Sequence, residues 1–159
     1  MKKIKVDLIN NAPYTHTFLL EDDTYSDKRN VYLVDKIAFE MIIKTQGQGY
    51  VIREYPDWDK NYQVRMIEEY RPSQKSAVPL MPRMAVHKDT INVPRGILET
   101  ILKKPIKTET KFLVNFGNGR HRFNYLRHFG ATAIPFQLSA ESAKNLNELV
   151  GHNVCKLIK

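Results

Sequence analysis

The sequence predicts an α+β domain, and three features of its pattern lead to this class. Apolar and polar residues alternate from Ile4 to Leu8, as they do in a half-buried strand. Compact apolar runs at 112–116 and 133–138 are typical of strands, and each is followed within a few residues by a segment with helical spacing. Because strands and helices are mixed irregularly along the chain, the α+β class fits best.

In the first half of the chain, strands are expected at 4–8, 31–34 and 51–55. Two helices are expected between and after them, with Asp35 and Asp57 as their N-caps. Gly47 and Gly49 are expected to end the first helix. The second helix carries a row of large side chains four residues apart, at Trp58, Tyr62, Met66 and Tyr70. Loop signals are dense over 10–27 and 71–82.

In the second half, an extended segment is expected at 80–86. A short helix follows, with Pro94 in its first turn and with Ile97, Leu98 and Ile101 along it. The last third has the clearest pattern. It predicts a strand at 112–116, a turn at 117–119, a helix from about 120 to 129 and a strand at 133–138. Ser139 should cap a final helix through Val150, Gly130 and Gly151 should end the two helices, and 154–158 should add an edge strand.

The composition describes a basic globular protein. Its 159 residues, 42% of them hydrophobic, can bury a core and form one domain over 1–159. Its 25 Lys and Arg residues exceed its 17 Asp and Glu residues, and the net charge of +8 favours phosphate-bearing partners. The single cysteine excludes a disulfide framework and a cysteine-cluster metal site. No stretch has the length and apolarity to cross a bilayer or to act as a signal peptide, so a cytoplasmic protein without membrane insertion is expected.

The segment Phe116-Gly117-Asn118-Gly119-Arg120-His121-Arg122, called the box below, carries most of the functional information. A strand runs into a glycine turn and a helix begins at once, so the first N–H groups of that helix favour an anion. Arg120 and Arg122 add forked donors suited to phosphate, and His121 titrates near neutrality. Cations at a helix N-terminus oppose the macrodipole, a conflict that a bound anion would remove. The pattern therefore predicts a phosphate site at Gly117, Asn118, Gly119, Arg120 and Arg122.

Further basic residues flank the box and are expected to bind nucleic acid, and those upstream of it are also expected to crowd its approach. They are Lys103, Lys104, Lys107 and Lys111 upstream and Arg127 and His128 on the following helix. The alternative interpretation is a glycine turn between core elements with solvated charges around it. The sequence pattern leaves both interpretations open.

The stretch FGNGRHRFNYLRHFGATAIPFQL, with Met81-Pro82-Arg83 upstream, resembles the signature of the plasmid fertility inhibition factor family. The resemblance is firm over 112–138, extends back to Val31, and is absent from 1–30, which would be an extension of a core at 31–159. That family resembles the ParB/sulfiredoxin-like superfamily, whose small mixed sheet and helices carry a strand–glycine turn–helix phosphate site. Sulfiredoxins have a cysteine nucleophile where this chain has Arg120, so sulfinic-acid reduction is excluded.

The resemblance implies a protein that blocks conjugative DNA transfer, and it adds Arg83 to the expected phosphate site. ATP or another nucleotide, with Mg²⁺, would be the cofactor. DNA, the nucleotide, and a coupling ATPase or a relaxosome protein would be the partners. One hypothesis is a nuclease or nucleoside triphosphatase, with His121 as general acid or base and Arg122 stabilising developing charge. Another is a non-catalytic module that blocks the transfer machinery by contact, and a third is non-specific DNA binding.

Other residues are expected to have structural roles. Asp57 and Asp59 lie at an expected helix start, where capping accounts for them, and Glu68 and Glu69 are expected on a solvated helix face. Cys155 is expected to be a small core residue. Four aromatic residues are candidates for base stacking, although their helical spacing favours a core: Trp58, Tyr62, Tyr70 and Tyr125. No metal ligand set is predicted.

Overall fold

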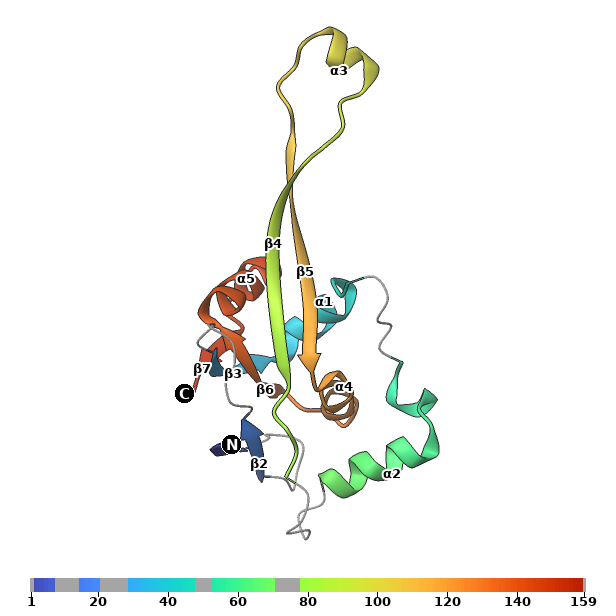
Figure 1. Cartoon of the computed structure of the whole chain (residues 1–159), viewed down its shortest axis with the longest axis vertical. Coiled ribbons are helices and arrows are strands. Elements are labelled where there is room, and N and C mark those ends of the chain that lie inside the picture. The colour runs from blue at the N-terminus through green and yellow to red at the C-terminus, as the bar shows by residue number, and fades with distance from the viewer. Residues whose placement is uncertain (1, 8–14, 21–28, 48–52, 71–77, 159) are drawn as a thin grey trace.

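The structure, a computed structural model, describes residues 2–7, 15–20, 29–47, 53–70 and 78–158. Its strands are β1 (Lys2–Asp7), β2 (Thr15–Leu20), β3 (Arg29–Asp35), β4 (Arg83–Asn92), β5 (Thr108–Asn118), β6 (Ala133–Ser139) and β7 (Cys155–Leu157). Its α-helices are α1 (Phe39–Lys44), α2 (Lys60–Glu69), α3 (Ile97–Ile101), α4 (Arg120–His128) and α5 (Ala140–Val150) (Figure 1). Two short 3-10 helices, η1 (Lys36–Ala38) and η2 (Tyr55–Asp57), precede α1 and α2.

A five-stranded mixed sheet organises the described part of the chain, in the order β5-β4-β6-β3-β7. Its neighbours are antiparallel except β4 and β6, which run parallel and meet at Arg83 and Gln137. β6 is the middle strand, and every residue from 134 to 138 is buried, as expected for a strand covered on both faces. β1 and β2 form a separate antiparallel pair. The α+β class is therefore confirmed.

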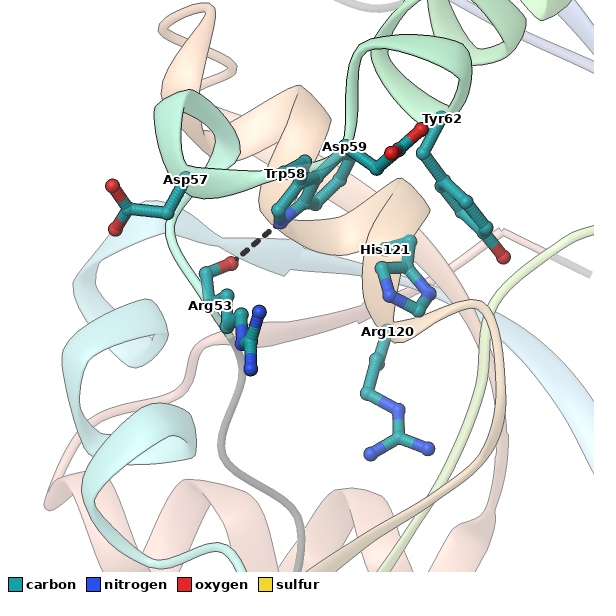
Figure 2. Close-up of a pocket in the computed structure, with 7 residues that line it drawn as sticks. All are labelled: Arg53, Asp57, Trp58, Asp59, Tyr62, Arg120 and His121. Atoms are coloured by element: carbon teal, nitrogen blue, oxygen red, sulfur yellow. Dashed lines mark hydrogen bonds between the residues drawn. The ribbon is translucent and has the colours of Figure 1, made fainter.

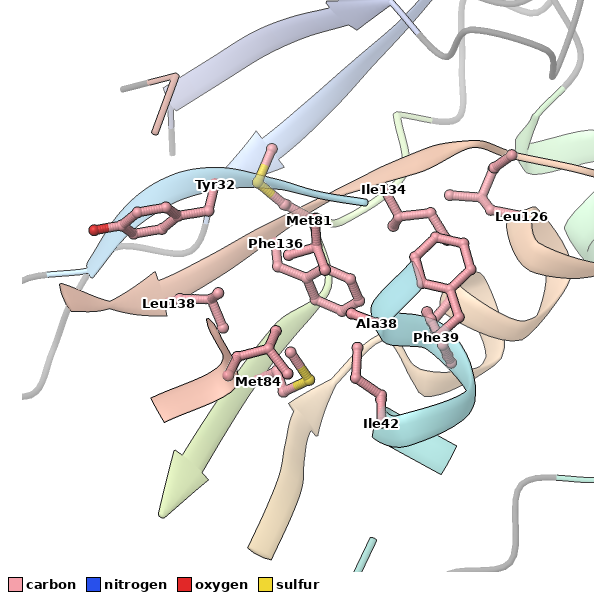
Figure 3. Close-up of a cluster of buried hydrophobic side chains, with 14 of the residues drawn as sticks. Tyr32, Ala38, Phe39, Ile42, Met81, Met84, Leu126, Ile134, Phe136 and Leu138 are labelled. Carbon is pink, nitrogen blue, oxygen red and sulfur yellow. The ribbon is translucent and has the colours of Figure 1, made fainter. Parts of the chain in front are cut away.

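The core lies where α1 and α4 pack on the sheet. The rings of Phe39 and Phe123 meet edge to face, with centroids 5.3 Å apart, and Phe123 lies 5.8 Å from Phe136 of β6. Figure 3 shows Phe39 and Ile42 of α1 beside Phe136 in this cluster. α5 packs against β4 and β6. Burial of these large side chains, rather than local propensity, holds α4 against the end of β5.

The β4–β5 hairpin projects far beyond the rest of the molecule (Figure 1). Its register pairs Arg83 with Asn118 near the core and Asn92 with Thr108 at the outer end. Val86 and Val114 are its last buried pair, and no residue from 87 to 111 is buried. This projecting segment, residues 87–111, is called the arm, and α3 lies at its end.

Several element predictions are confirmed. β1, β3, α4, β6, α5 and β7 lie where the sequence pattern places them. The carboxylate of Asp35 accepts the N–H of Ile37 at 2.9 Å, and the hydroxyl of Ser139 accepts the N–H of Ser142 at 3.0 Å, so both predicted caps are present. Gly130 and Gly151 have positive φ angles of 82° and 75° just beyond α4 and α5. These are C-terminal glycines of the predicted kind.

Other predictions for the first half are wrong. β2 lies in the segment 10–27, which was expected to be a loop. The part of the predicted strand 51–55 that the structure describes leads into η2, because Pro56 suits a helical first turn. Asp59, not Asp57, caps α2, since its carboxylate accepts the N–H of Asn61 at 2.8 Å. α1 ends at Lys44 with Thr45 as C-cap, before Gly47, and Gly49 lies outside the described residues.

In the second half, the strands are longer than predicted. β5 continues to Asn118, so Gly117 and Asn118 belong to the strand and only Gly119 forms the turn. β4 likewise extends to Asn92 because it pairs with β5 along its whole length. Pro94 precedes α3, whose N-cap is Gly96. Within the described ranges, no helix combines the length and apolarity needed to span a membrane.

Candidate functional site

A single residue, Gly119, connects β5 to α4. Its φ angle of 76° lies in the left-handed region, which favours glycine. A Cβ atom at this position would lie 2.6 Å from Cα of Pro82, so the close backbone leaves no room for a side chain. The carbonyl of Gly119 accepts the N–H of Phe123 at 2.9 Å and starts the helical ladder. Gly119 thus sets the direction of α4 and puts Arg120 and His121 in its first turn.

Arg83 lies beside the box, although it is far away in sequence. Its backbone N–H donates to Oδ1 of Asn118 at 3.1 Å. A Cβ atom at Gly117 would lie 2.6 Å from Nε of Arg83, so the arginine side chain crosses β5 over this glycine. The structure therefore brings Arg83, Gly117, Asn118 and Gly119 together at the end of the β4–β5 pair.

A cavity of about 330 Å³ adjoins the first turn of α4 (Figure 2). It is lined by Arg53, Asp57, Trp58, Asp59, Tyr62, Arg120 and His121. The guanidinium groups of Arg53 and Arg120 both extend past the rings toward the same end of this space, whereas the carboxylate of Asp57 points away from His121 (Figure 2). The cavity thus combines two guanidinium groups with a wall of three rings.

The wall consists of Trp58, Tyr62 and His121. The His121 ring lies 5.1 Å from Trp58 and 4.8 Å from Tyr62, measured between ring centroids. Trp58 is buried, but 40% of Tyr62 is exposed and His121 is also exposed. A partly accessible aromatic wall of this kind offers a planar ligand a stacking surface. The expected core role therefore fits the buried Trp58 better than the exposed Tyr62, and both line the cavity.

The backbone carbonyl of Arg53 accepts two hydrogen bonds, one from its own segment and one from α4. The carbonyl of Arg53 accepts Nε1–H of Trp58 at 2.7 Å and an amide N–H of Asn124. Asn124 is fully buried inside α4. The ring of Tyr55 also packs on Tyr125 of α4, with centroids 5.4 Å apart. These contacts keep the segment before α2 against α4, and so maintain the cavity.

Arg122 does not line the cavity. Its Nη2 and Nε donate to Oε1 of Glu69 at 2.7 and 3.2 Å, and both side chains are largely buried, with 17% and 11% of their surfaces exposed. The expectation that Glu69 lies on a solvated face is therefore wrong. This charge-assisted pair ties the end of α2 to α4. It positions the two helices that border the cavity.

Two effects lower the pKa of His121. Partial desolvation of the ring against Trp58 and Tyr62 is the larger one, and the neighbouring Arg120 and Arg122 guanidinium groups add to it by repelling a proton. The imidazole is therefore mainly neutral at pH 7, and it can accept a proton from a ligand or a water molecule. An anion bound beside Arg120 would reduce the repulsion and raise the pKa of His121.

A second hollow, of about 300 Å³, also reaches Arg120. It is lined by Gln46, Gly47, Val114, Asn115, Phe116, Gly117 and Arg120. Arg120 thus borders both hollows, and Gly117, over which Arg83 crosses, belongs to the second one. Arg120 is the residue that the two linings share.

The upstream lysines do not crowd the box. Lys103, Lys104 and Lys107 lie around the outer end of the arm, and Lys111 lies on β5 within it. The ten residue steps from Thr108 to Asn118 correspond to about 33 Å at a strand rise of about 3.3 Å per residue. The expectation that these lysines crowd the box is wrong, because β5 is a long extended strand that separates them from it in space. Their expected contact with nucleic acid stays a prediction.

The two basic residues at the end of α4 contact other residues of the protein. Arg127 pairs with Glu54 and, at 3.3 Å, with Glu40, and its Nε donates to Asn124 at 3.2 Å. The His128 ring packs on Tyr55, with centroids 5.0 Å apart. Both residues therefore brace the segment that precedes α2. Their expected contact with nucleic acid stays a prediction.

The cavity provides little for a metal ion. Within the described ranges, no three His, Cys, Asp or Glu side chains come together as a ligand set. The carboxylate of Asp59 already accepts the N–H of Asn61 as the cap of α2. The residues present therefore do not form a Mg²⁺ site of their own.

Sequence reasoning missed two residues of this region, Arg53 and Glu69. Arg53 lies in an irregular segment before η2, where no periodicity marks it. Glu69 meets Arg122 across 53 positions of sequence, and no local pattern reports such a pair. By contrast, Cys155 is buried, as predicted.

Comparison with known proteins gives one match. A family model described as plasmid fertility inhibition factor matches residues 31–151. The matched range runs from β3 to α5, so it includes Arg83, the Gly119 turn and every residue that lines the cavity. No curated protein and no solved structure is similar enough to the chain to count as a match.

Proposed function

Because the chain belongs to the plasmid fertility inhibition factor family, we propose that it inhibits conjugative DNA transfer and binds nucleotide or nucleic-acid phosphate beside the Gly119 turn. One observation carries the second part. The guanidinium groups of Arg53 and Arg120 reach the same end of a cavity that is walled by Trp58, Tyr62 and His121. The first part follows from the family. The strand–turn–helix arrangement also supports our proposal of a ParB/sulfiredoxin-like fold.

A ligand with a phosphate and a planar ring matches both the guanidinium groups and the aromatic wall of this cavity. Guanidinium forks donate to phosphate oxygens in pairs, and the first N–H groups of α4 add further donors. A base stacked on Tyr62 and His121 would occupy the aromatic wall. A cavity of about 330 Å³ accommodates a mononucleotide or one residue of a single strand. Arg83 and the second hollow would receive the next phosphate.

Hydrolysis is the catalytic form of this proposal, and His121 is its base. A neutral imidazole can take the proton of an attacking water, and Arg120 can stabilise the charge that develops on the phosphate. Arg120 replaces Arg122 in this role, because Glu69 already holds Arg122 outside the cavity. Mg²⁺, where required, would be held mainly by phosphate oxygens and would neutralise their charge.

Equilibrium binding of a labelled single-stranded oligonucleotide and of ATP tests the site. Arg53→Gln and Arg120→Gln should each weaken binding by about tenfold or more, because a hydrogen bond between charged groups contributes about 1.5–3 kcal/mol. The matched control is Lys144→Gln, which removes the same charge from the exposed face of α5. Equal losses in all three variants would mean that only overall charge matters, which is the non-specific alternative.

Turnover assays separate the catalytic form from the non-catalytic one. ATP hydrolysis and nicking of single- and double-stranded DNA should be measured with and without Mg²⁺, for the wild type and for His121→Ala. Activity that persists in His121→Ala would remove the role given to that imidazole. Inactive wild-type protein that still reduces transfer frequency in cells would favour a module that blocks the transfer machinery by contact.

A further inference from the structure

The end of the arm exposes an unusual set of aliphatic side chains. Over residues 93–107, five of them are between 52% and 82% exposed: Ile97, Leu98, Ile101, Leu102 and Ile106. Four of these follow the spacing i, i+1, i+4 and i+5, which puts them on one face of α3 and its continuation. No residue of α3 is buried. Single exposed aliphatic residues are ordinary, but a contiguous group of them marks an interaction surface.

Hydrogen bonds connect the two sides of this end without burying those side chains. Val93 donates to the carbonyl of Lys107 at 2.9 Å and closes the hairpin ladder. Glu99 accepts the N–H of Gly96 at 3.2 Å and pairs with Lys107 at 3.1 Å across the loop. Lys103, at the end of α3, has a φ angle of 48°, which lysine rarely adopts. These contacts support the loop that carries the aliphatic face, and an ordered loop pays a lower ordering cost on binding.

The charges around the aliphatic face are strongly one-sided. Residues 93–107 contain four cations, Arg95, Lys103, Lys104 and Lys107, against one carboxylate, that of Glu99. The pair of Glu99 with Lys107 leaves three positive charges around the exposed aliphatic residues. A surface of matching chemistry would combine an apolar groove with a rim of Asp and Glu side chains. A second copy of the same tip, being equally positive, would be repelled.

We propose that the arm tip, residues 93–107, is a docking element that inserts the apolar face of α3 into an acid-rimmed apolar groove on a partner protein. The distance of about 33 Å between the tip and the Gly119 turn, at about 3.3 Å per strand residue, keeps this surface apart from the phosphate site. One protein can then hold both ligands at once. The choice of a protein over an anionic membrane rests on the transfer-inhibition role proposed above.

Variants of the tip test this assignment in the full-length chain. Ile97→Ser combined with Ile101→Ser should reduce inhibition of plasmid transfer by about tenfold or more, because both variants remove apolar surface that the partner would bury. The melting temperature and oligonucleotide binding should stay unchanged, since neither residue packs on the domain. Ile37→Ser is the matched control, because Ile37 is 60% exposed on η1, outside the arm. Wild-type inhibition by the double variant would overturn the proposal.

A cross-linking experiment identifies the class of occupant directly. A photo-crosslinking amino acid is placed at position 98, or at position 37 as control, in cells that carry a transfer-competent plasmid. We expect a protein adduct from position 98 alone, and a several-fold lower yield when Lys103→Glu and Lys104→Glu reverse the charge of the tip. An adduct whose yield does not change on charge reversal, or an adduct to a second copy of the chain, would contradict the proposal of an acid-rimmed partner protein. So would co-sedimentation of the wild type, but not the double variant, with phosphatidylglycerol vesicles.

These experiments can refute the proposed function and the docking proposal independently. If the wild type does not reduce transfer at all, the proposed function is wrong, and the adduct at position 98 with its charge dependence still decides the role of the arm. If oligonucleotide binding persists while no adduct forms at position 98, the docking proposal alone is wrong.

Discussion

Replacement of Gly119 by alanine should destabilise the protein more than the same replacement at Gly130. Both glycines have left-handed backbone, with φ angles of 76° and 82°. A Cβ atom in this conformation costs about 1–2 kcal/mol at either position. At Gly119 the Cβ atom would also lie 2.6 Å from Cα of Pro82, whereas at Gly130 nothing lies within 4 Å. Overpacking against rigid backbone adds about 1–3 kcal/mol.

The expected loss is therefore about 2–5 kcal/mol for Gly119→Ala and about 1–2 kcal/mol for Gly130→Ala. Urea unfolding measures both values by linear extrapolation, provided that the m-value is unchanged. For a chain of this size, each kcal/mol lowers the melting temperature by about 2–4 °C. Because Gly119 sets the direction of α4, its variant should also weaken ligand binding, while the Gly130 variant should not.

Two results would refute this reasoning. Equal losses at the two positions would mean that Pro82 does not crowd the β5–α4 turn. Losses near zero at both would mean that neither residue has a positive φ angle. In either case, the connection that places Arg120 and His121 at the cavity would need another explanation.

The remaining predictions concern buried charge and protonation. Arg122→Met should lower the free energy of unfolding, measured in urea, by about 2–4 kcal/mol, because it leaves the buried Glu69 carboxylate without its cation. The double variant Arg122→Met with Glu69→Met should recover most of this loss, because it removes the unpaired carboxylate as well. Burial raises the pKa of Cys155 to about 12, so a thiol reagent at pH 8 should label it only after unfolding, and rapid labelling of the native protein would contradict its burial. Because the pKa of His121 is lowered in the folded protein, the unfolded chain takes up this proton at a higher pH than the folded one. The free energy of unfolding should therefore fall as the pH drops through 6.5, and His121→Gln should remove that part of the pH dependence. An NMR titration should find the pKa of His121 below 6.5 and higher in Arg120→Gln, and an unshifted value in both would contradict the electrostatic account.

Local signals were sufficient to predict the order of the elements in the last third of the chain, although not the length of β5. Ser139, Gly130 and Gly151 mark helix ends through their own backbone and hydrogen-bonding properties, which do not depend on distant partners. The strand β6 could also be predicted without knowledge of its neighbours, because a strand buried on both faces is apolar throughout. The strand–turn–helix order around Gly119 followed from the same local reasoning.

The rest depended on pairing that no local pattern contains. β4 and β5 extend beyond their predicted lengths because each supplies hydrogen-bond partners to the other. The long hairpin that they form places the lysines of the arm far from the box. The cavity exists because Asn124 and Arg122 of α4 bind Arg53 and Glu69, residues more than 50 positions away. The aliphatic residues of α3 were placed on a helix correctly, but their exposure follows from the projection of the arm.

The fluorescence of Trp58 tests the central claim most directly, because it is the only tryptophan of the chain and it lines the cavity. ATP or a short single-stranded oligonucleotide should change its emission in a saturable way, and Arg120→Gln should shift the midpoint to higher ligand concentration by about tenfold or more. Inorganic phosphate, which has no ring to stack, should compete for the site with much less change in emission. Saturable binding detected through a labelled ligand, without any change in Trp58 emission, would place the ligand elsewhere and contradict the account.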